Sequence, residues 1–542
     1  MNLPAEDAPF QIALKSSGYF MSLNSNGVVL SKYAQPLYLK SYKGGYAISD
    51  GNQSLAYLGT NTWSLVGSDK ASTMIITPVG ESYTIKGTNG FIGVDNDEMG
   101  SSVFGNKDSH DWLISEYVPV DLNIADVFVT EAYDHIAADE VTISAAVDGT
   151  TAVINNGTFT ANSVTLNIEV PNNKWSFVVM PCDIPVADLK NTQENTQWKI
   201  YRHDGTARAN GDFDNVWVAV SESEILLNGE GYIFQSRRGE EATSVFSFTT
   251  TTPATIASIF ANSDIKVTLN ENKSIYACNS GWNLVGNPYL AFFNKSKMST
   301  TAPIIVWEDN NYVTYTADDN YVLSPLQAFF IQTSEEAELT FSKDGRQTDA
   351  TISSDVRSRR LPVAMRALYD ITLSDGNNID KTRFVINDGA SLNYEIGRDA
   401  SKFMSEDVSV PQIFTVENNV KCSVNERPLS TGIINLGVRV GAAGEYTISA
   451  RTLASAVVLE DKLTGDMIEL NDETDSYTFT ATEAGTIVGR FVIHANEDAT
   501  SICNISALDA NDAIYTLQGV KVSKNAVKKG IYLVGGKKVM VK

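Results

Sequence analysis

The stretches that decide the fold of the N-terminal part are Phe10-Gln-Ile, Tyr46-Ala-Ile and Tyr83-Thr-Ile, which follow one another at spacings of 36 and 37 residues. Two further sets of residues keep nearly the same period: Phe20, Tyr57 and Phe91, and then Leu37, Met74 and Trp112. A repeat of about 37 residues with short strands cannot bury its apolar face alone, so the three copies must pack on one another. The repeat therefore predicts a β-trefoil over residues 1–118.

The rest of the chain also has the pattern of β structure. Short stretches such as Val164-Thr-Leu-Asn-Ile and Tyr477-Thr-Phe-Thr alternate apolar and polar residues, and turn signals such as Asn156-Gly157 separate them. Amphipathic helix patterns are scarce. We expect an all-β chain with an N-terminal β-trefoil, tandem β-sandwich domains and a short hairpin-like C-terminal module.

The middle of the chain carries a second duplication. Three pairs of stretches match at offsets of 107, 106 and 97 residues: Trp175–Pro181 with Trp282–Pro288, Ile200–Asp204 with Val306–Asn310, and Gly231–Gln235 with Ala328–Gln332. The shrinking offset indicates that the second copy has lost loop residues. Because Trp175 and Trp282 stand at strand starts, we expect both to be core anchors.

These patterns divide the chain into seven segments. We expect a trefoil at 1–118, a short β-roll connector at 119–170, the first copy at 171–270, the second copy at 271–350, a linker at 351–362, a β-sandwich at 363–497 and a C-terminal module at 505–542. Within the linker, Arg357-Ser-Arg-Arg360 is either a solvated segment or a cleavage site for an Arg-specific protease.

Composition excludes several function classes. The 542 residues include 65 acidic and 41 basic side chains, for a net charge of −24. Nucleic acid and anionic membrane surfaces are therefore not expected partners. No apolar run approaches the roughly 20 residues of a membrane span. With 4 Cys, no CxxC pair and 4 His, we expect neither a metal site nor a cofactor.

Catalytic motifs are absent from the sequence. It has no His-Glu-x-x-His, no Gly-x-Ser-x-Gly, no phosphate loop and no dinucleotide fingerprint. A Cys182–His203 dyad and acidic pairs such as Asp95 and Asp97 are the weak alternatives. The stretch 95–100 opens like a calcium loop, but Met99 breaks that pattern. We predict no catalytic residue, with a secreted glycoside hydrolase or peptidase as the enzyme alternative.

Each trefoil repeat ends in a comparable triplet: Gln35-Pro-Leu37, Ser72-Thr-Met74 and His110-Asp-Trp112. The trefoil resembles the ricin-type lectins, whose repeats end in Gln-x-Trp, although no triplet here is intact. The resemblance implies carbohydrate binding. Its best candidate residues are His110, Asp111 and Trp112 in the third lobe, with Tyr57, Asn61 and Trp63 in the second. The alternative is that Leu37, Met74 and Trp112 belong to the core.

The C-terminal third resembles secreted proteins of the Bacteroidales. Arg383–Asn387, Tyr394–Phe403 and Val424–Leu429 are similar to a β-sandwich common in those proteins, and the tail from Ile514 to Lys542 resembles the type IX secretion C-terminal sorting domain. The tail is also basic in an otherwise acidic chain, which fits a targeting signal that a receptor recognises. The resemblance implies export by the type IX machinery and a sorting signal that includes Gly519, Lys529, Gly530, Tyr532, Lys537 and Lys538.

The N-terminal segment Met1-Asn-Leu-Pro-Ala-Glu6 has neither the basic nor the apolar region of a signal peptide. We therefore expect the numbering to begin after a removed signal. The sequence predicts a secreted or outer-membrane-anchored, non-enzymatic binding or adhesion protein, with a glycan or a host surface protein as its partner. A purely structural surface protein is the alternative.

Overall fold

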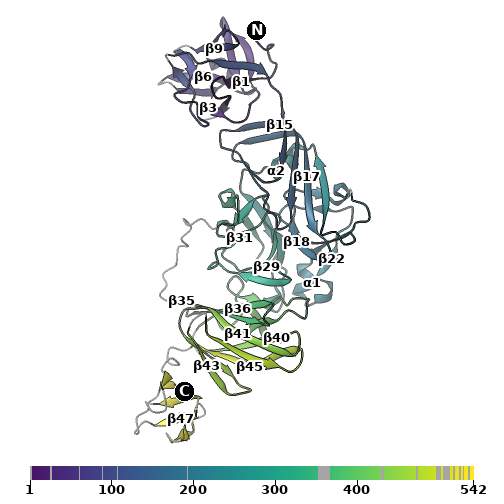
Figure 1. The fold of residues 1–542 in the computed structure, drawn as a ribbon, viewed down its shortest axis with the longest axis vertical. Coiled ribbons are helices and arrows are strands. Elements are labelled where there is room, and N and C mark those ends of the chain that lie inside the picture. The colour runs from purple at the N-terminus through teal and green to yellow at the C-terminus, as the bar shows by residue number, and fades with distance from the viewer. Residues whose placement is uncertain are drawn as a thin grey trace.

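The computed structural model of the chain is an elongated, all-β molecule with the N-terminal domain at one end and the C-terminal module at the other (Figure 1). It describes residues 3–24, 27–59, 62–87, 90–106, 108–191, 193–351, 366–428, 432–471, 474–495, 502–503, 513–516, 519–523, 526–528, 530–534 and 537–541. The α-helices in these ranges are two short ones, α1 (Gly205–Ala209) and α2 (Pro253–Ile259). None of the described helices has the length and apolar character needed to span a membrane.

The N-terminal domain is a β-trefoil, as the repeat predicts. Three equivalent pairings connect the start of each repeat with its end: Phe10 with Leu37, Tyr46 with Met74, and Tyr83 with Trp112. The first and last strands, β1 and β12, pair along their whole length and close the domain. The strands are β1 (Phe10–Leu14), β2 (Phe20–Asn24), β3 (Gly27–Ser31), β4 (Tyr38–Tyr42), β5 (Gly45–Ser49), β6 (Ser54–Gly59), β7 (Thr62–Val66), β8 (Ile75–Val79), β9 (Ser82–Gly87), β10 (Gly90–Gly93), β11 (Phe104–Asn106) and β12 (Trp112–Glu116).

The next sheet has the order β13–β15–β17–β25–β20, and a small pair, β14–β16, lies apart from it. Strands β13, β15 and β17 run parallel, like the rungs of a β-roll, while β25 is antiparallel to β17. One sheet thus crosses the boundary expected at residue 170. The strands are β13 (Val120–Ile124), β14 (Val127–Val129), β15 (His135–Ala146), β16 (Ala152–Ile154), β17 (Thr158–Pro171), β20 (Lys190–Asn191) and β25 (Thr243–Thr250).

The duplicated stretches form two four-stranded sheets with the same strand order. The first copy is β18–β24–β21–β22 and the second is β27–β32–β29–β30. Trp175 pairs with Gln235 in the first copy and Trp282 with Gln332 in the second, as the offsets of 107 and 97 predict. The strands are β18 (Trp175–Val179), β21 (Gln197–His203), β22 (Trp217–Ala219), β24 (Gly231–Arg237), β27 (Trp282–Gly286), β29 (Ile304–Glu308), β30 (Asn311–Tyr315) and β32 (Ala328–Gln332).

The pairing of β21 and β29 corrects the offset of 106 residues that the sequence match gave for these strands. Tyr201 lies opposite Ile233, and Ile305 lies opposite Phe330, so the true offset there is 104 residues and not 106. A two-residue shift keeps every side chain on the same face of the sheet, which is why the sequence match still gave the right pattern. The loop that the second copy lacks comes directly after these strands. In the first copy, residues 204–216, including α1, join β21 to β22, whereas in the second copy only residues 309–310 join β29 to β30.

The two copies contact each other reciprocally. Val178 forms a bridge with Gln327, and Val285 forms one with Glu230. Val178 and Val285 are equivalent positions, as are Glu230 and Gln327, so an approximate twofold axis relates the copies. The contact is close enough to require glycine: a Cβ at Gly286 would come within 2.8 Å of the Gln327 carbonyl oxygen.

Small sheets surround the copies. Strands β19 (Ile184–Pro185) and β23 (Ile225–Leu226) pair beside the first copy, and β26 (Ile265–Leu269) pairs with β33 (Ala337–Phe341). Beside the second copy, β28 (Phe292–Asn294) lies between β31 (Val322–Leu323) and β34 (Arg346–Gln347).

The following domain is a β-sandwich whose strands join in the order β43–β42–β45–β40–β38–β39–β36–β35–β41–β44, with β37 beside β39. Its strands are β35 (Arg366–Ser374), β36 (Ile379–Asn387), β37 (Ala400–Ser401), β38 (Gln412–Glu417), β39 (Val420–Arg427), β40 (Ile433–Val440), β41 (Gly444–Leu453), β42 (Val457–Asp461), β43 (Asp466–Leu470), β44 (Ser476–Ala481) and β45 (Gly485–His494).

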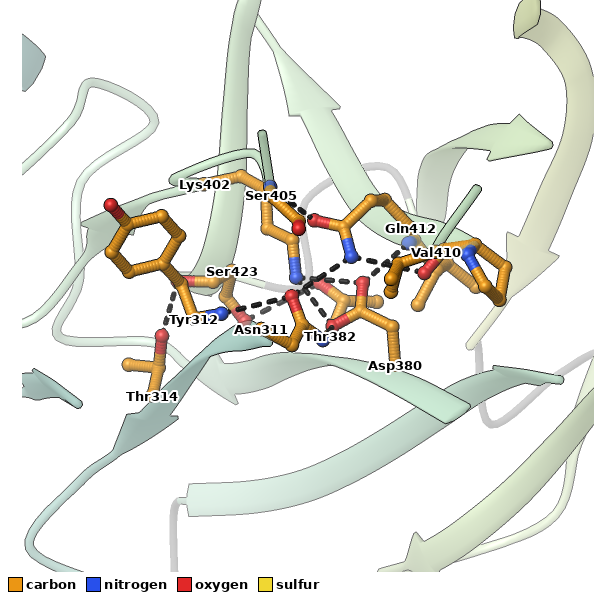
Figure 2. Close-up of polar contacts among 12 residues, drawn as sticks. Asn311, Tyr312, Thr314, Asp380, Thr382, Lys402, Ser405, Val410, Gln412 and Ser423 are labelled. Carbon is orange, nitrogen blue, oxygen red and sulfur yellow. Dashed lines mark hydrogen bonds and ion pairs between the residues drawn. The ribbon is translucent and has the colours of Figure 1, made fainter. Parts of the chain in front are cut away.

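A buried polar cluster joins the second copy to the sandwich (Figure 2). The Asp380 carboxylate accepts from Lys402 Nζ at 2.7 Å, from Asn311 Nδ2 at 3.0 Å and from the Ile413 N–H at 2.7 Å. The side chains of Lys402 and Asp380 are 1% and 3% exposed. A buried ion pair needs such full hydrogen bonding, so this interface has a defined geometry.

The C-terminal module is larger than the predicted hairpin. The hairpin itself is β49 (Gly530–Val534) with β50 (Lys537–Val541), and the sheet continues through β46 (Ile502–Cys503), β47 (Ile514–Thr516) and β48 (Lys521–Val522). Its own small core consists of Ile514, Val527 and Val534.

Candidate ligand-binding cleft

A cleft of about 240 Å³ opens where the first copy, the second copy and the sandwich meet. Six of its eight lining residues are aromatic, and one is charged. They are Trp175 and Phe177 of β18, Tyr201 of β21, Trp217 of β22, Ile233 of β24, Trp307 of β29, Tyr312 of β30 and Glu406 of the sandwich.

Strand alternation brings these rings to one face. Trp175 and Phe177 are two residues apart on β18, and so share a face of the sheet. The next residue, Val178, points the other way, into the core that the first copy shares with β17 and β25. On β21, Tyr201 likewise faces the cleft, while its neighbour Ile200 faces the core. One face of the first copy thus builds the core, and the other carries the aromatic rings.

The equivalent face of the second copy is covered. Trp282 and Leu284, the counterparts of Trp175 and Phe177, are 1% and 5% exposed. Phe403 of the sandwich lies over Trp282 at a ring-centroid distance of 4.8 Å. The core prediction is confirmed for Trp282 and is wrong for Trp175, which is partly exposed in the cleft. The difference arises because the sandwich covers only one of the two copies.

Several rings of the cleft stand at steep angles to one another, although Phe177 and Trp217 lie closer to parallel, at 29°. Phe177 and Trp307 meet at 73° with centroids 5.9 Å apart, and Trp307 and Tyr312 meet at 68° and 4.8 Å. Trp175 and Tyr201 meet at 70° and 5.7 Å. Edge-to-face contacts are a favourable way to pack aromatic rings. Here they produce a box with several walls instead of a flat platform.

Glu406 is placed at the cleft by its neighbour in the sequence. Ser405 Oγ donates to the Asn310 carbonyl at 2.8 Å, and Arg439 donates to the Ser405 carbonyl at 2.8 Å. Burial and the negative charge of Glu406 raise the pKa of Tyr312 well above its ordinary value. The Tyr312 hydroxyl therefore stays protonated, and Glu406 supplies the negative charge of the cleft wall.

Cys182 and His203 do not form a catalytic dyad. Cys182 lies in the core on one side of the first copy, and burial raises the pKa of its thiol to about 12. His203 lies on the aromatic side, 4.8 Å from Phe330 and 5.5 Å from Trp217 between ring centroids. Burial, aided by the charge of Arg208, lowers the pKa of His203 to about 3. A protonated thiol and an imidazole on opposite faces of a sheet cannot exchange a proton.

The third lobe of the trefoil does not offer its tryptophan to a ligand. Trp112 is fully buried, and its indole Nε1 donates to the Ile92 carbonyl at 3.0 Å. His110 is half-buried against Gly93, where a Cβ would come within 2.3 Å of its Nδ1. Asp111 is exposed, with Lys15 Nζ at 3.7 Å. Trp112 therefore belongs to the core of the trefoil, as Leu37 and Met74 do, which was the alternative to a sugar-binding role.

In the second lobe, Trp63 is 2% exposed, so it cannot stack on a sugar either. Tyr57 is partly exposed and packs edge-on against Trp63, with centroids 5.3 Å apart. Asn61 lies outside the described residues. Both tryptophans among the lectin-like candidates are thus core residues. For Trp112 the reason is that the residues that recur with the period of the trefoil build its core.

Of the predicted sorting residues, Gly519 is exposed in a turn with φ of 80°, and Tyr532 lies on β49. Gly530, Lys537 and Lys538 lie on β49 and β50, while Lys529 and the whole linker segment 357–360 fall outside the described residues. The described residues contain no group of three or more His, Cys, Asp or Glu side chains that can hold a metal ion.

Comparisons with known proteins give one family model and several solved structures. A family model described as a domain of unknown function (DUF8693) matches residues 290–494, which include both sides of the polar cluster in Figure 2. No curated protein matches the chain. Three similar solved structures are a salivary protein from Culex quiquefasciatus of the Cysteine and Tryptophan-Rich family, the BEL β-trefoil, and a proteinase inhibitor from Coprinopsis cinerea. Their identities are 14%, 15% and 10%, with TM-scores of 0.18, 0.19 and 0.17. Each match covers 21% of this chain, and 96%, 97% and 100% of the respective structure.

Proposed function

We propose that the chain is a non-catalytic binding protein and that the aromatic cleft is its ligand site. The observation that carries the proposal is the uncovered aromatic face of the first copy, whose counterpart in the second copy is sealed by the sandwich. Large rings left open to water forgo the free energy that burial would give, roughly 25 cal/mol for each Å². A ligand that fills the cleft recovers that energy, and clefts lined by rings with few polar groups are the usual form of small ligand sites.

The chemistry of the cleft supports binding over catalysis. Its lining has one carboxylate and neither a thiol nor an imidazole. Glycoside hydrolysis needs two carboxylates across the scissile bond, and nucleophilic hydrolysis needs an activated nucleophile with a base. The rings and Glu406 supply stacking surfaces and one charge, which suffice to hold a ligand.

The test uses the full chain and follows its tryptophan fluorescence against a panel of glycans and short peptides. We expect at least one member to bind, and we expect Tyr201→Ala in the cleft to weaken that binding at least tenfold. Tyr276→Ala, at a residue that is 63% exposed and outside the cleft, is the matched control. If no member binds, or if Tyr201→Ala binds unchanged, the proposal fails and the structural alternative gains support.

We further propose that the protein acts outside the cell, as a secreted or surface-anchored protein of a Bacteroidales-type organism. The resemblance of the tail to a type IX sorting domain supports this, and so does the separate small core of the C-terminal module. In a host with the type IX machinery, removal of residues 505–542 should keep the chain inside the cell envelope. Export of the truncated chain would refute the sorting role.

Recognition of glycans by the trefoil stays a prediction with fewer candidate residues. The exposed Asp111 and the partly exposed Tyr57 support it more than the buried tryptophans do. In the glycan panel, Asp111→Asn distinguishes a trefoil site from the cleft, because only a trefoil site would lose affinity in that variant.

A further inference from the structure

The covered half of the duplicated aromatic face already holds a cation. The Arg208 guanidinium, carried on α1 of the first copy, lies 3.8 Å from the ring centroid of Phe403. It also lies 5.6 Å from the rings of Trp282 and Phe213. These distances are within the range in which a cation is attracted to the face of an aromatic ring.

Aromatic rings surround this guanidinium, and among the described residues no carboxylate forms an ion pair with it. Burial lowers the pKa of Arg208 to about 10, and the groups that oppose this shift are the phenols of Tyr312 and Tyr394 and the thiol of Cys278. Its Nε is buried without a hydrogen-bond partner among the described residues. The rings around Trp282 therefore hold a cation without neutralising it, which a guanidinium tolerates better than an ammonium because it is weakly hydrated and stacks on rings.

The counterpart of this arrangement in the cleft lacks its cation. Trp175 is the equivalent of Trp282, but the connection in the second copy that corresponds to the α1 loop is only residues 309–310. That turn is too short to carry a side chain across to Trp175 as the longer loop carries Arg208 to Trp282. Because the second copy lacks this loop, no side chain from it fills the position beside Trp175 that Arg208 fills beside Trp282.

Charge favours a cation there. Glu406 is the one charged residue that lines the cleft, and the chain as a whole has a net charge of −24. A carboxylate beside aromatic walls matches a guanidinium, which pairs with carboxylates through its fork of N–H donors and stacks on rings through its faces. The acidic field of the protein would also speed the approach of a basic partner.

We propose that the cleft receives the guanidinium of an arginine side chain presented by a polypeptide partner, in the place that corresponds to Arg208 in the covered half. This rests on the proposed function, because it names the ligand group of the same cleft. Trp175, Phe177 and Trp307 provide the rings, and Glu406 provides the counter-charge.

The experiment compares N-acetylarginine amide with N-acetylcitrulline amide, which has nearly the same shape but no charge, by titration of the full chain at low salt. We expect the arginine probe to bind at least tenfold more tightly than the citrulline probe. Glu406→Gln should weaken the arginine probe by threefold to tenfold and leave the citrulline probe unchanged. Glu336→Gln, at an exposed glutamate outside the cleft, is the matched control. Because Glu406 is exposed, its substitution should not disturb folding.

Each outcome separates the two proposals. Equal binding of both probes, or no effect of Glu406→Gln, overturns the guanidinium assignment and leaves the cleft as a site for a neutral ligand. A second outcome also overturns the guanidinium assignment but keeps the cleft as the ligand site. In that outcome another panel member binds, its binding is lost in Tyr201→Ala, and the arginine probe does not bind. If neither probe nor any panel member binds, both proposals fail.

Discussion

Replacing Lys402 with methionine tests the polar cluster that fixes the sandwich on the second copy. The change keeps the length and apolar stem of the side chain but removes the ammonium, whose Nζ lies 2.7 Å from both oxygens of Asp380. Among the described residues, Asp380 then keeps two neutral donors, Asn311 and the Ile413 N–H, at a site where its side chain is 3% exposed. Leaving one member of a buried ion pair without its partner costs about 3–5 kcal/mol.

Hydrogen exchange measures this loss in the right part of the molecule, since a chain of several domains does not unfold in a single two-state step. We expect the opening free energy of β36 and β38 to fall by that amount in Lys402→Met. Lys462→Met, at an exposed lysine of the same domain, should change it by less than about 0.5 kcal/mol. Adding Asp380→Asn to Lys402→Met should restore about 1–3 kcal/mol, because the uncompensated charge is removed. A loss below about 1 kcal/mol in the single variant, or no recovery in the double variant, would refute this account of the interface.

Three other substitutions, one of them paired with a control variant, test further parts of the structure. The pKa of His203 is about 3 in the folded chain and about 6.5 when unfolded, so the unfolded state takes up the proton first as the pH falls. The stability of the first copy should therefore drop by about 1.4 kcal/mol per pH unit between pH 6.5 and pH 3, and the opening free energy of β21, measured by hydrogen exchange at pH 7, 5 and 4, should fall less in His203→Phe. Trp112→Ala should destabilise the trefoil by about 3–5 kcal/mol in thermal unfolding, and a loss near zero would mean that its ring does not pack in the core. Gly281→Ala should prevent correct folding, since φ is 71° and the new Cβ would lie 1.7 Å from the Thr333 carbonyl oxygen. At Gly376 a new Cβ meets open space, so Gly376→Ala should lower the free energy of unfolding by only about 1 kcal/mol. Equal expression levels and equal melting temperatures of the two variants would contradict this.

The positions of the repeats were predictable because a repeat must build the same contacts each time. The period of about 37 residues correctly located Leu37, Met74 and Trp112 as equivalent positions, and the structure pairs them with Phe10, Tyr46 and Tyr83. The same reasoning also placed Trp112 in a lectin-like site, and the structure buries that residue. A residue that recurs with the repeat is selected by the core, so its recurrence says nothing about a ligand.

The cleft was only half visible in the sequence. The alternation Trp175-x-Phe177 and the match of Trp175 with Trp282 show that each copy begins a strand with a tryptophan and that the first copy has a second ring on the same face. The sequence shows that Leu284 and Ile305 stand in the second copy where the first copy has Phe177 and Tyr201, but it does not show which of the two faces is covered. The difference comes from Phe403, which belongs to a later domain and packs on the face of the second copy, against Trp282 and Phe330.

The sequence by itself determined the all-β class, the trefoil and the duplication, since strand alternation and repeat periods are local properties that each segment carries alone. Only the tertiary structure decided which copies of a repeated face are buried, because that depends on where a distant domain docks. Burial in turn decided the chemistry: it made Trp112 and Trp282 parts of a core, kept His203 neutral, and left Trp175 and Glu406 facing an open cleft.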